Sequence, residues 1–162
     1  MTIAAVIAAG AVGVNIEDSR APGGPLFDPA YQAERIRAAR AASASAGLPE
    51  LFINARTGVF LYGIGVLGSR LDDVLARSDA YAKAGADGLF VPGLTDLQAI
   101  TELATASSLP VNVTAGPGAP PVSELAAAGV RRVSLGTAIT QAAYTLTKRT
   151  VAEQHSRRIS HG

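Results

Sequence analysis

The chain has 162 residues, of which 48% are hydrophobic and 17% are charged, which suits one globular domain and argues against a disordered chain. Its formal net charge is +1, so the sequence does not indicate a nucleic-acid or anionic-membrane partner. The lack of cysteine excludes disulfides, thiolate metal ligands and a thiol nucleophile, and it agrees with the cytoplasmic location that we expect.

The chain begins with an apolar run over residues 1–16, which is too short to span a bilayer and lacks the basic start of a signal peptide. We expect a short helix over residues 2–9, which Gly10 ends, and a strand over residues 12–17. The strand is rich in β-branched residues and is flanked by glycine, which favours burial on both of its faces.

The rest of the chain alternates between short apolar runs of strand length and longer segments of helix length. Further strands are expected at residues 51–55, 88–91, 110–114 and 130–135. Further helices are expected at residues 30–46, 70–84, 96–107, 122–128 and 137–153, with Thr95 able to cap the one that starts at residue 96. Residues 20–29 are expected to form a loop that is long enough to act as a lid or binding loop. The glycine-rich residues 58–69 are also expected to form a loop.

This alternation predicts an α/β fold with parallel strands and right-handed crossovers. Three similar phrases, AGAVGVNI (9–16), AGADGLFV (84–91) and AAGVRRVSL (127–135), each place a helix-ending glycine before a strand. The recurrence is typical of a (β/α) barrel, and about five of the eight units of a TIM-type barrel are present. A doubly wound sheet is the alternative, but no glycine-rich phosphate fingerprint follows the first strand. We therefore expect a partial barrel over residues 1–153 and a flexible tail over residues 154–162.

Polar side chains follow the predicted strands, at the edge where parallel α/β folds build their sites. Glu17 and Asp18 follow the first strand, and Arg56 and Thr57 follow the second. The two acids could instead cap the next element, and the arginine could form an ordinary surface salt bridge.

Five phrases in register, VNIEDS, INART, AGADGLFVPG, LPVNVT and GVRRVSLGTA, resemble the isocitrate lyase/phosphoenolpyruvate mutase superfamily from residue 1 to about residue 153. The resemblance implies a TIM-type barrel that binds Mg²⁺ and small α-keto or 2-hydroxy acids. Members of this family make or break C–C or P–C bonds next to a pyruvyl enolate.

By this resemblance, Glu17 is the carboxylate that holds Mg²⁺ through water, and Arg56 clamps the substrate carboxylate. Asn112 and Thr114 correspond to a polar N-x-T that contacts the substrate, although a turn and a helix cap would explain them equally well. Oxygen ligands suit a hard cation, a guanidinium suits a carboxylate, and a metal supplies positive charge at an enolate oxygen.

The sequence also departs from the family pattern. The strands that carry the family's D-x-D metal ligands have no counterpart here, and the K-[KR]-C-G loop of the lyases is missing. Gly58 stands where the family has Asp, and Pro92-Gly93 replaces a Glu of the lyases. We therefore expect weak Mg²⁺ binding and doubtful activity. The alternatives are a non-catalytic oligomerisation or interaction module, and a different barrel enzyme that binds phosphate near Gly136.

An incomplete barrel leaves two open strand edges, at residues 12–17 and 130–135, and neither carries the Lys, Pro or bulge that protects an edge. We also expect an exposed apolar patch on the uncovered inner surface. These features predict a self-associating protein or homo-oligomer, with docking of the last helix onto a neighbour as one route.

Overall fold

Five parallel strands form one sheet in the order β1-β2-β3-β4-β5, in the computed structural model, which describes residues 2–116 and 118–159. The strands are β1 (Gly13–Glu17), β2 (Phe52–Arg56), β3 (Gly88–Val91), β4 (Val111–Thr114) and β5 (Arg132–Ser134). Within these described residues each strand pairs only with its neighbours in sequence, so the predicted parallel, sequential sheet is confirmed. The arrangement is that of an incomplete (β/α) barrel.

Helices alternate with these strands, and their ends fall close to the predicted ones. They are α1 (Ile3–Ala8), α2 (Pro29–Ser45), α3 (Arg70–Lys83), α4 (Leu97–Ala106), α5 (Val122–Ala127) and α6 (Ala138–Ile159), with a short 3-10 turn η1 (Leu67–Ser69) before α3. The cap of α4 is Asp96 rather than Thr95, because the Asp96 carboxylate accepts from the amide of Ala99 at 2.8 Å. Helix α6 continues past the predicted end at residue 153, and residues 160–162 of the predicted tail lie outside the described residues.

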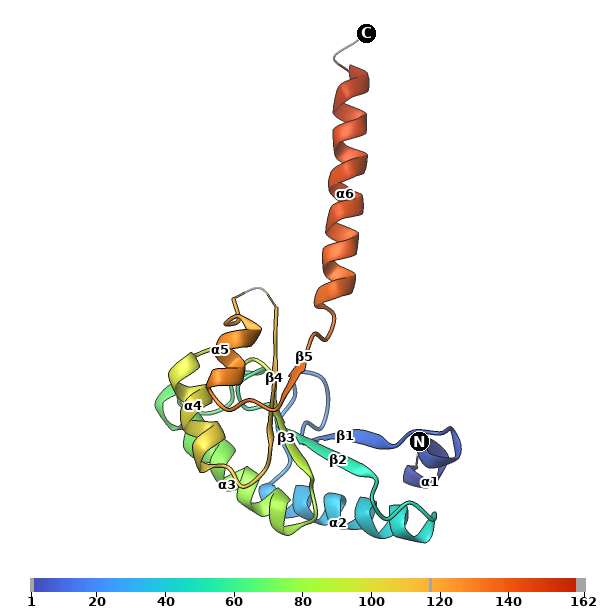
Figure 1. The fold of residues 1–162 in the computed structure, drawn as a ribbon, viewed down its shortest axis with the longest axis vertical. Helices are drawn as coiled ribbons and strands as arrows, with labels where there is room; N and C mark the ends of the chain where they lie inside the picture. The colour runs from blue at the N-terminus through green and yellow to red at the C-terminus, as the bar shows by residue number, and fades with distance from the viewer. Residues whose placement is uncertain (1, 117, 160–162) are drawn as a thin grey trace.

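The sheet has one apolar face, which α2 to α5 cover along the outer side of its curve (Figure 1). Because side chains alternate along a strand, every second residue points to the helices. These outer-face residues belong to the hydrophobic core or pack against it, and are Val14, Ile16, Ile53, Ala55, Leu89, Val91, Val111, Val113 and Val133.

The other residues of the strands point to the opposite side, which we call the inner face. Most of them are polar, namely Asn15, Glu17, Asn54, Arg56, Asn112, Thr114, Arg132 and Ser134. The same face also carries two aromatic side chains, Phe52 and Phe90. The prediction of an exposed apolar inner surface is therefore wrong. The prediction that β1 is buried on both faces is also wrong, because β1 is an edge strand whose Asn15 is exposed and whose Val14 is half-buried.

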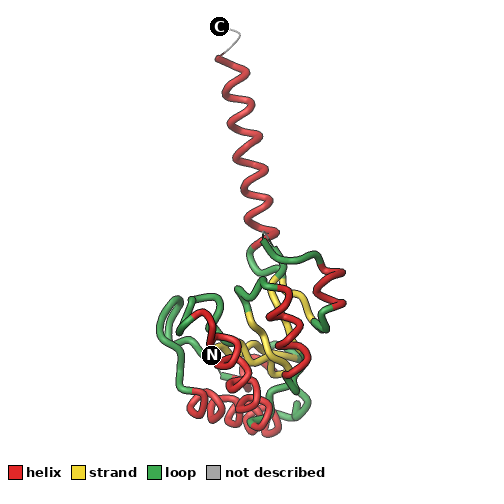
Figure 2. Tube along the Cα trace, turned by 90° about the vertical axis from the view of Figure 1, so that its left-hand side faces the viewer, coloured by secondary structure: helices red, strands yellow, loops and turns green. Residues whose placement is uncertain are grey.

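Helix α6 projects away from the rest of the molecule (Figures 1 and 2). All residues from Ile139 to Glu153 are exposed, including Ile139, Tyr144, Leu146 and Val151. This helix therefore exposes large apolar side chains of the kind that the sequence predicted for the inner face. None of the helices in the described residues is long and apolar enough to cross a membrane.

Candidate functional site

Glu17 and Arg56 meet at the C-terminal edge of the sheet. They end the neighbouring strands β1 and β2 and are register partners, so their side chains leave the sheet side by side. The Arg56 Nε atom lies 3.5 Å from Glu17 Oε2, and both side chains are 27% exposed. The adjacency expected from consecutive parallel strands is thus present.

Tyr62 is a third member of this group, which was not predicted from the sequence. Its hydroxyl donates to Glu17 Oε1 at 3.0 Å, from the loop that follows β2. Helix α2 also holds Glu17, because Arg35 donates to the Glu17 main-chain carbonyl at 2.8 Å. The glycine-rich loop has no periodicity, so the sequence held no signal for this contact.

Arg56 has hydrogen-bonding capacity to spare. Its buried Nε atom has no hydrogen-bond partner, and within the described chain its guanidinium makes only the ion pair with Glu17 and a contact with the ring of Phe90 at 5.4 Å. A guanidinium presents paired N–H donors that match the two oxygens of a carboxylate. Arg56 is therefore a suitable receptor for a small anionic ligand.

Arg56 and Thr114 line one cavity of about 760 Å³ at the C-terminal edge of the sheet. Its other walls include polar side chains, Asn15, Thr95, Ser134, Thr137 and Gln141, and apolar ones, Leu61, Phe90, Pro92 and Leu135. Among the described residues that line it there is no carboxylate. Glu17 instead lines a second cavity, of about 740 Å³, beside the open edge of β1 and the loop 20–22.

Asn112 is less well placed than Thr114. It lies in the same transverse row as Arg56, but Phe90 of β3 stands between them. Its side chain is buried and accepts a hydrogen bond from the Ser134 hydroxyl at 3.1 Å, and it is not among the residues that line the cavity. The structure therefore brings Glu17, Arg56 and Tyr62 together, places Thr114 across the cavity, and leaves Asn112 within the sheet.

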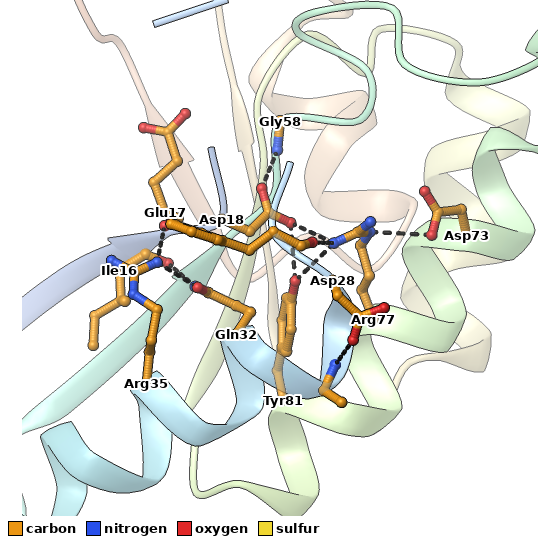
Figure 3. Close-up of polar contacts among 12 residues, drawn as sticks. Ile16, Glu17, Asp18, Asp28, Gln32, Arg35, Gly58, Asp73, Arg77 and Tyr81 are labelled. Atoms are coloured by element: carbon orange, nitrogen blue, oxygen red, sulfur yellow. Dashed lines mark hydrogen bonds and ion pairs between the residues drawn. The ribbon is translucent and has the colours of Figure 1, made fainter. Parts of the chain in front are cut away.

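A buried polar cluster is centred on Asp18, the residue that follows the end of β1 (Figure 3). One Asp18 oxygen accepts from the amide of Gly58 at 2.9 Å. The other accepts from the Tyr81 hydroxyl at 2.9 Å and from Arg77 at 3.1 Å. Arg77 also donates to the carbonyl of Phe27 at 3.0 Å. The cluster joins β1, the loop before α2, the loop after β2 and helix α3.

Burial governs the titration of the Asp18 cluster. Burial, followed by the charge of Asp18, raises the pKa of the Tyr81 hydroxyl well above its ordinary value of 10.0. Burial alone would lower the pKa of Arg77, but Tyr81 and the charges of Asp18 and Asp73 outweigh it, and the net shift is upward. Tyr81 therefore stays neutral and Arg77 charged, so Asp18 has one cationic and two neutral donors.

The described residues do not form a ready metal site. They contain no group of three acidic or histidine side chains that could hold an ion. The oxygens of Asp18 are used by its cluster, and those of Glu17 face a tyrosine hydroxyl and an arginine. Mg²⁺ prefers several unshared oxygen ligands, and Glu17 offers few.

Comparison with known proteins places this arrangement in a family. The family model described as phosphoenolpyruvate phosphomutase matches residues 1–155. A protein of Burkholderia cenocepacia J2315 assigned as a phosphonomutase has a crystal structure with a TM-score of 0.80 and 45% identity, and the match covers 96% of this chain and 61% of that one. An oxaloacetate decarboxylase of Bradyrhizobium sp. (strain BTAi1) is 35% identical over an alignment of 153 residues, and the match covers 88% of this chain and 50% of the relative.

A further structure, a phosphonopyruvate hydrolase with bound oxalate and Mg²⁺, has a TM-score of 0.72 at 21% identity, which concerns the fold alone. The match covers 96% of this chain and 54% of that one. This chain spans about half the length of the curated relatives that it matches. By its family match and its five sequential parallel strands, the chain belongs to the phosphoenolpyruvate phosphomutase family of the isocitrate lyase/phosphoenolpyruvate mutase superfamily.

Proposed function

We propose that this chain binds the carboxylate of a small α-keto or 2-hydroxy acid through Arg56, at the C-terminal edge of its sheet. The observation that carries the proposal is the Arg56 guanidinium, which borders a large cavity and makes no hydrogen bond within the described chain. The relative that is 35% identical is named an oxaloacetate decarboxylase, and oxaloacetate is an acid of this class. Thr114, on β4, supplies a hydroxyl donor at the same cavity.

Glu17 acts in this proposal mainly as the anionic partner of Arg56. The family relationship suggests Mg²⁺ as a cofactor, which would supply positive charge at an enolate oxygen. With one carboxylate, already paired, we expect Mg²⁺ binding to be millimolar or weaker. We accordingly expect negligible turnover of isocitrate, 2-methylisocitrate, oxaloacetate or phosphonopyruvate by this chain, and we keep the cytoplasmic location as a prediction.

Isothermal titration with oxalate tests the proposed ligand site. We expect measurable binding to the wild-type chain and a loss of about tenfold or more in Arg56→Gln, because the paired donors are gone. Arg132→Gln is the matched control, because Arg132 also lies on the inner face but stacks on Phe52 instead of lining the large cavity. Equal affinity in wild type and Arg56→Gln would reject the proposal.

A pyruvate-release assay tests the second part. Clear turnover of any of the four acids that disappears in Glu17→Ala would show that the chain is a complete catalyst and that our expectation of inactivity is wrong. Oxalate binding without turnover would instead agree with a site that has kept recognition alone.

Self-association is a second proposed property, and α6 favours it. This helix exposes Ile139, Tyr144, Leu146 and Val151, and large apolar side chains of this kind are common in helix-mediated contacts. We propose that α6 docks onto a second copy of the chain, which would also serve the alternative role of an oligomerisation module.

A further inference from the structure

Tyr62 depends on the lack of a side chain at Gly58. A Cβ atom at position 58 would lie 2.6 Å from Cδ2 and 2.7 Å from Cε2 of the Tyr62 ring, which is closer than real contacts allow. The main chain closes the same turn, because the Tyr62 amide donates to the Gly58 carbonyl at 2.9 Å. The ring therefore occupies the space that a side chain at position 58 would need.

The backbone of Gly58 has little freedom to move away from this ring. Its amide donates to the buried carboxylate of Asp18, which Tyr81 and Arg77 hold from the other side. A side chain added at position 58 would consequently push the Tyr62 ring outward rather than shift the backbone. Displacing the ring would break the bond from the Tyr62 hydroxyl to Glu17.

Glu17 has a donor or a cation at each carboxylate oxygen. Oε1 accepts from the Tyr62 hydroxyl at 3.0 Å, and Oε2 lies 3.5 Å from Arg56 Nε. A divalent cation that approached Glu17 would compete with the first contact for the charge on Oε1 and would be repelled by the second. Two neighbours thus bias this carboxylate against a metal ion.

We propose that Tyr62 is a positioning residue that commits Glu17 to Arg56 instead of to a divalent cation, and that Gly58 makes this possible. Carboxylate recognition by Arg56 is then independent of metal. This inference rests on the proposed function only where it concerns the acid ligand, and the part about the cation stands by itself.

Binding of Mn²⁺, followed by electron paramagnetic resonance on the full chain, tests the cation part. Wild type should bind Mn²⁺ weakly, and Tyr62→Phe should bind it about tenfold more tightly, the equivalent of one hydrogen bond to a charged group. Gly58→Ala should have the same effect through displacement of the ring. Gly68→Ala is the matched control, because a Cβ there would meet no atom within 4 Å, and it should leave Mn²⁺ binding unchanged.

The ring position has its own measurement. In NMR spectra of protein with labelled tyrosine, Tyr62→Phe assigns the Tyr62 signal, which should shift in Gly58→Ala and stay in place in Gly68→Ala. Tyr62→Phe leaves the backbone untouched, so it keeps the test valid if Gly58→Ala fails to fold.

Oxalate affinity should be the same with and without Mg²⁺.

Unchanged Mn²⁺ affinity in Tyr62→Phe would overturn the proposal, as would tight Mn²⁺ binding by wild type that Glu17→Gln abolishes. Oxalate binding that requires Mg²⁺ would overturn the claim of metal independence. If Arg56→Gln bound oxalate as tightly as the wild type, only the proposed function would be contradicted, because the Mn²⁺ and NMR results do not depend on oxalate binding.

Discussion

The two faces of the sheet are made by the same five strands and have opposite character. The outer face consists of small and branched apolar side chains, most of them fully buried under α2 to α5. The inner face carries Asn15, Asn54 and Asn112 together with two arginines, and its polar groups bond to one another, as in the 2.8 Å contact between Asn54 and Asn15. Folding free energy therefore comes mainly from the outer face.

The inner face can tolerate water because its groups are polar. This difference separates stability from ligand binding, since substitution of a partly exposed inner-face side chain such as Arg56 should alter recognition with little cost to the fold. Asn54 and Asn112 are exceptions, because both are buried and hydrogen-bonded. It also moves the expected site of self-association from the sheet to α6. Substitutions on the outer face, on the inner face and on α6 should therefore differ in their effects on stability and assembly.

The Asp18 cluster joins the two faces at their common edge, and breaking it should have the largest effect. Asp18→Asn leaves Arg77 buried with its main charge partner removed, since this pair is 8% and 0% exposed. We expect a loss of about 3–5 kcal/mol in the free energy of unfolding, measured with urea. Asp79→Asn, which breaks the exposed pair with Lys83, should cost less than about 1 kcal/mol. A similar, small loss in both variants would contradict the structural role of the cluster.

A pair of truncations compares the faces directly. Ile53→Ala removes a fully buried outer-face side chain and should cost about 2–5 kcal/mol. Arg132→Ala removes an exposed inner-face side chain that stacks on the Phe52 ring at 4.9 Å, and should cost less than about 1 kcal/mol. Thermal or urea unfolding measures both, and equal losses would show that the inner face also carries the fold.

High pH should weaken the cluster through Tyr81. Because its pKa is raised in the folded state, the stabilisation is fully present below the unfolded pKa of about 10 and is lost as the pH rises through the folded value. The free energy of unfolding of wild type should therefore fall above about pH 10, by up to about 1.4 kcal/mol per pH unit from this group. Tyr81→Phe should have a flatter profile over the same range. Parallel profiles would indicate that Tyr81 titrates normally.

Substitutions in α6 should have the smallest effect on stability and a clear effect on assembly. Replacing Tyr144 and Leu146 by Ser should change the free energy of unfolding at low concentration by less than about 0.5 kcal/mol, because both side chains are exposed. The same change should abolish the concentration dependence that we expect in sedimentation of the wild type. Thr147→Ser is the control. A wild type that stays monomeric at high micromolar concentration would contradict the proposed self-association.

The strand order and the meeting of Glu17 and Arg56 could be predicted because both follow from alternation and from the common edge of parallel strands. The polar inner face was also present in the sequence, in the alternating pairs N-x-E, N-x-R and N-x-T, but apolar content outweighed that pattern. Two other features were out of reach. Tyr62 depends on the path of an aperiodic loop, and the partner of Asp18 is Arg77, far along the chain.

The sequential strand order also bears on how the molecule acquires and loses its structure. Each strand–helix unit adds to the one made just before it, so few contacts require the closure of very long loops, and growth can proceed outward from any neighbouring pair of units. Protection of backbone amides from hydrogen exchange should then be graded rather than uniform. It should be highest in β2, β3 and β4, which have partners on both sides, and should fall toward β1 and β5, where opening costs only one row of bonds.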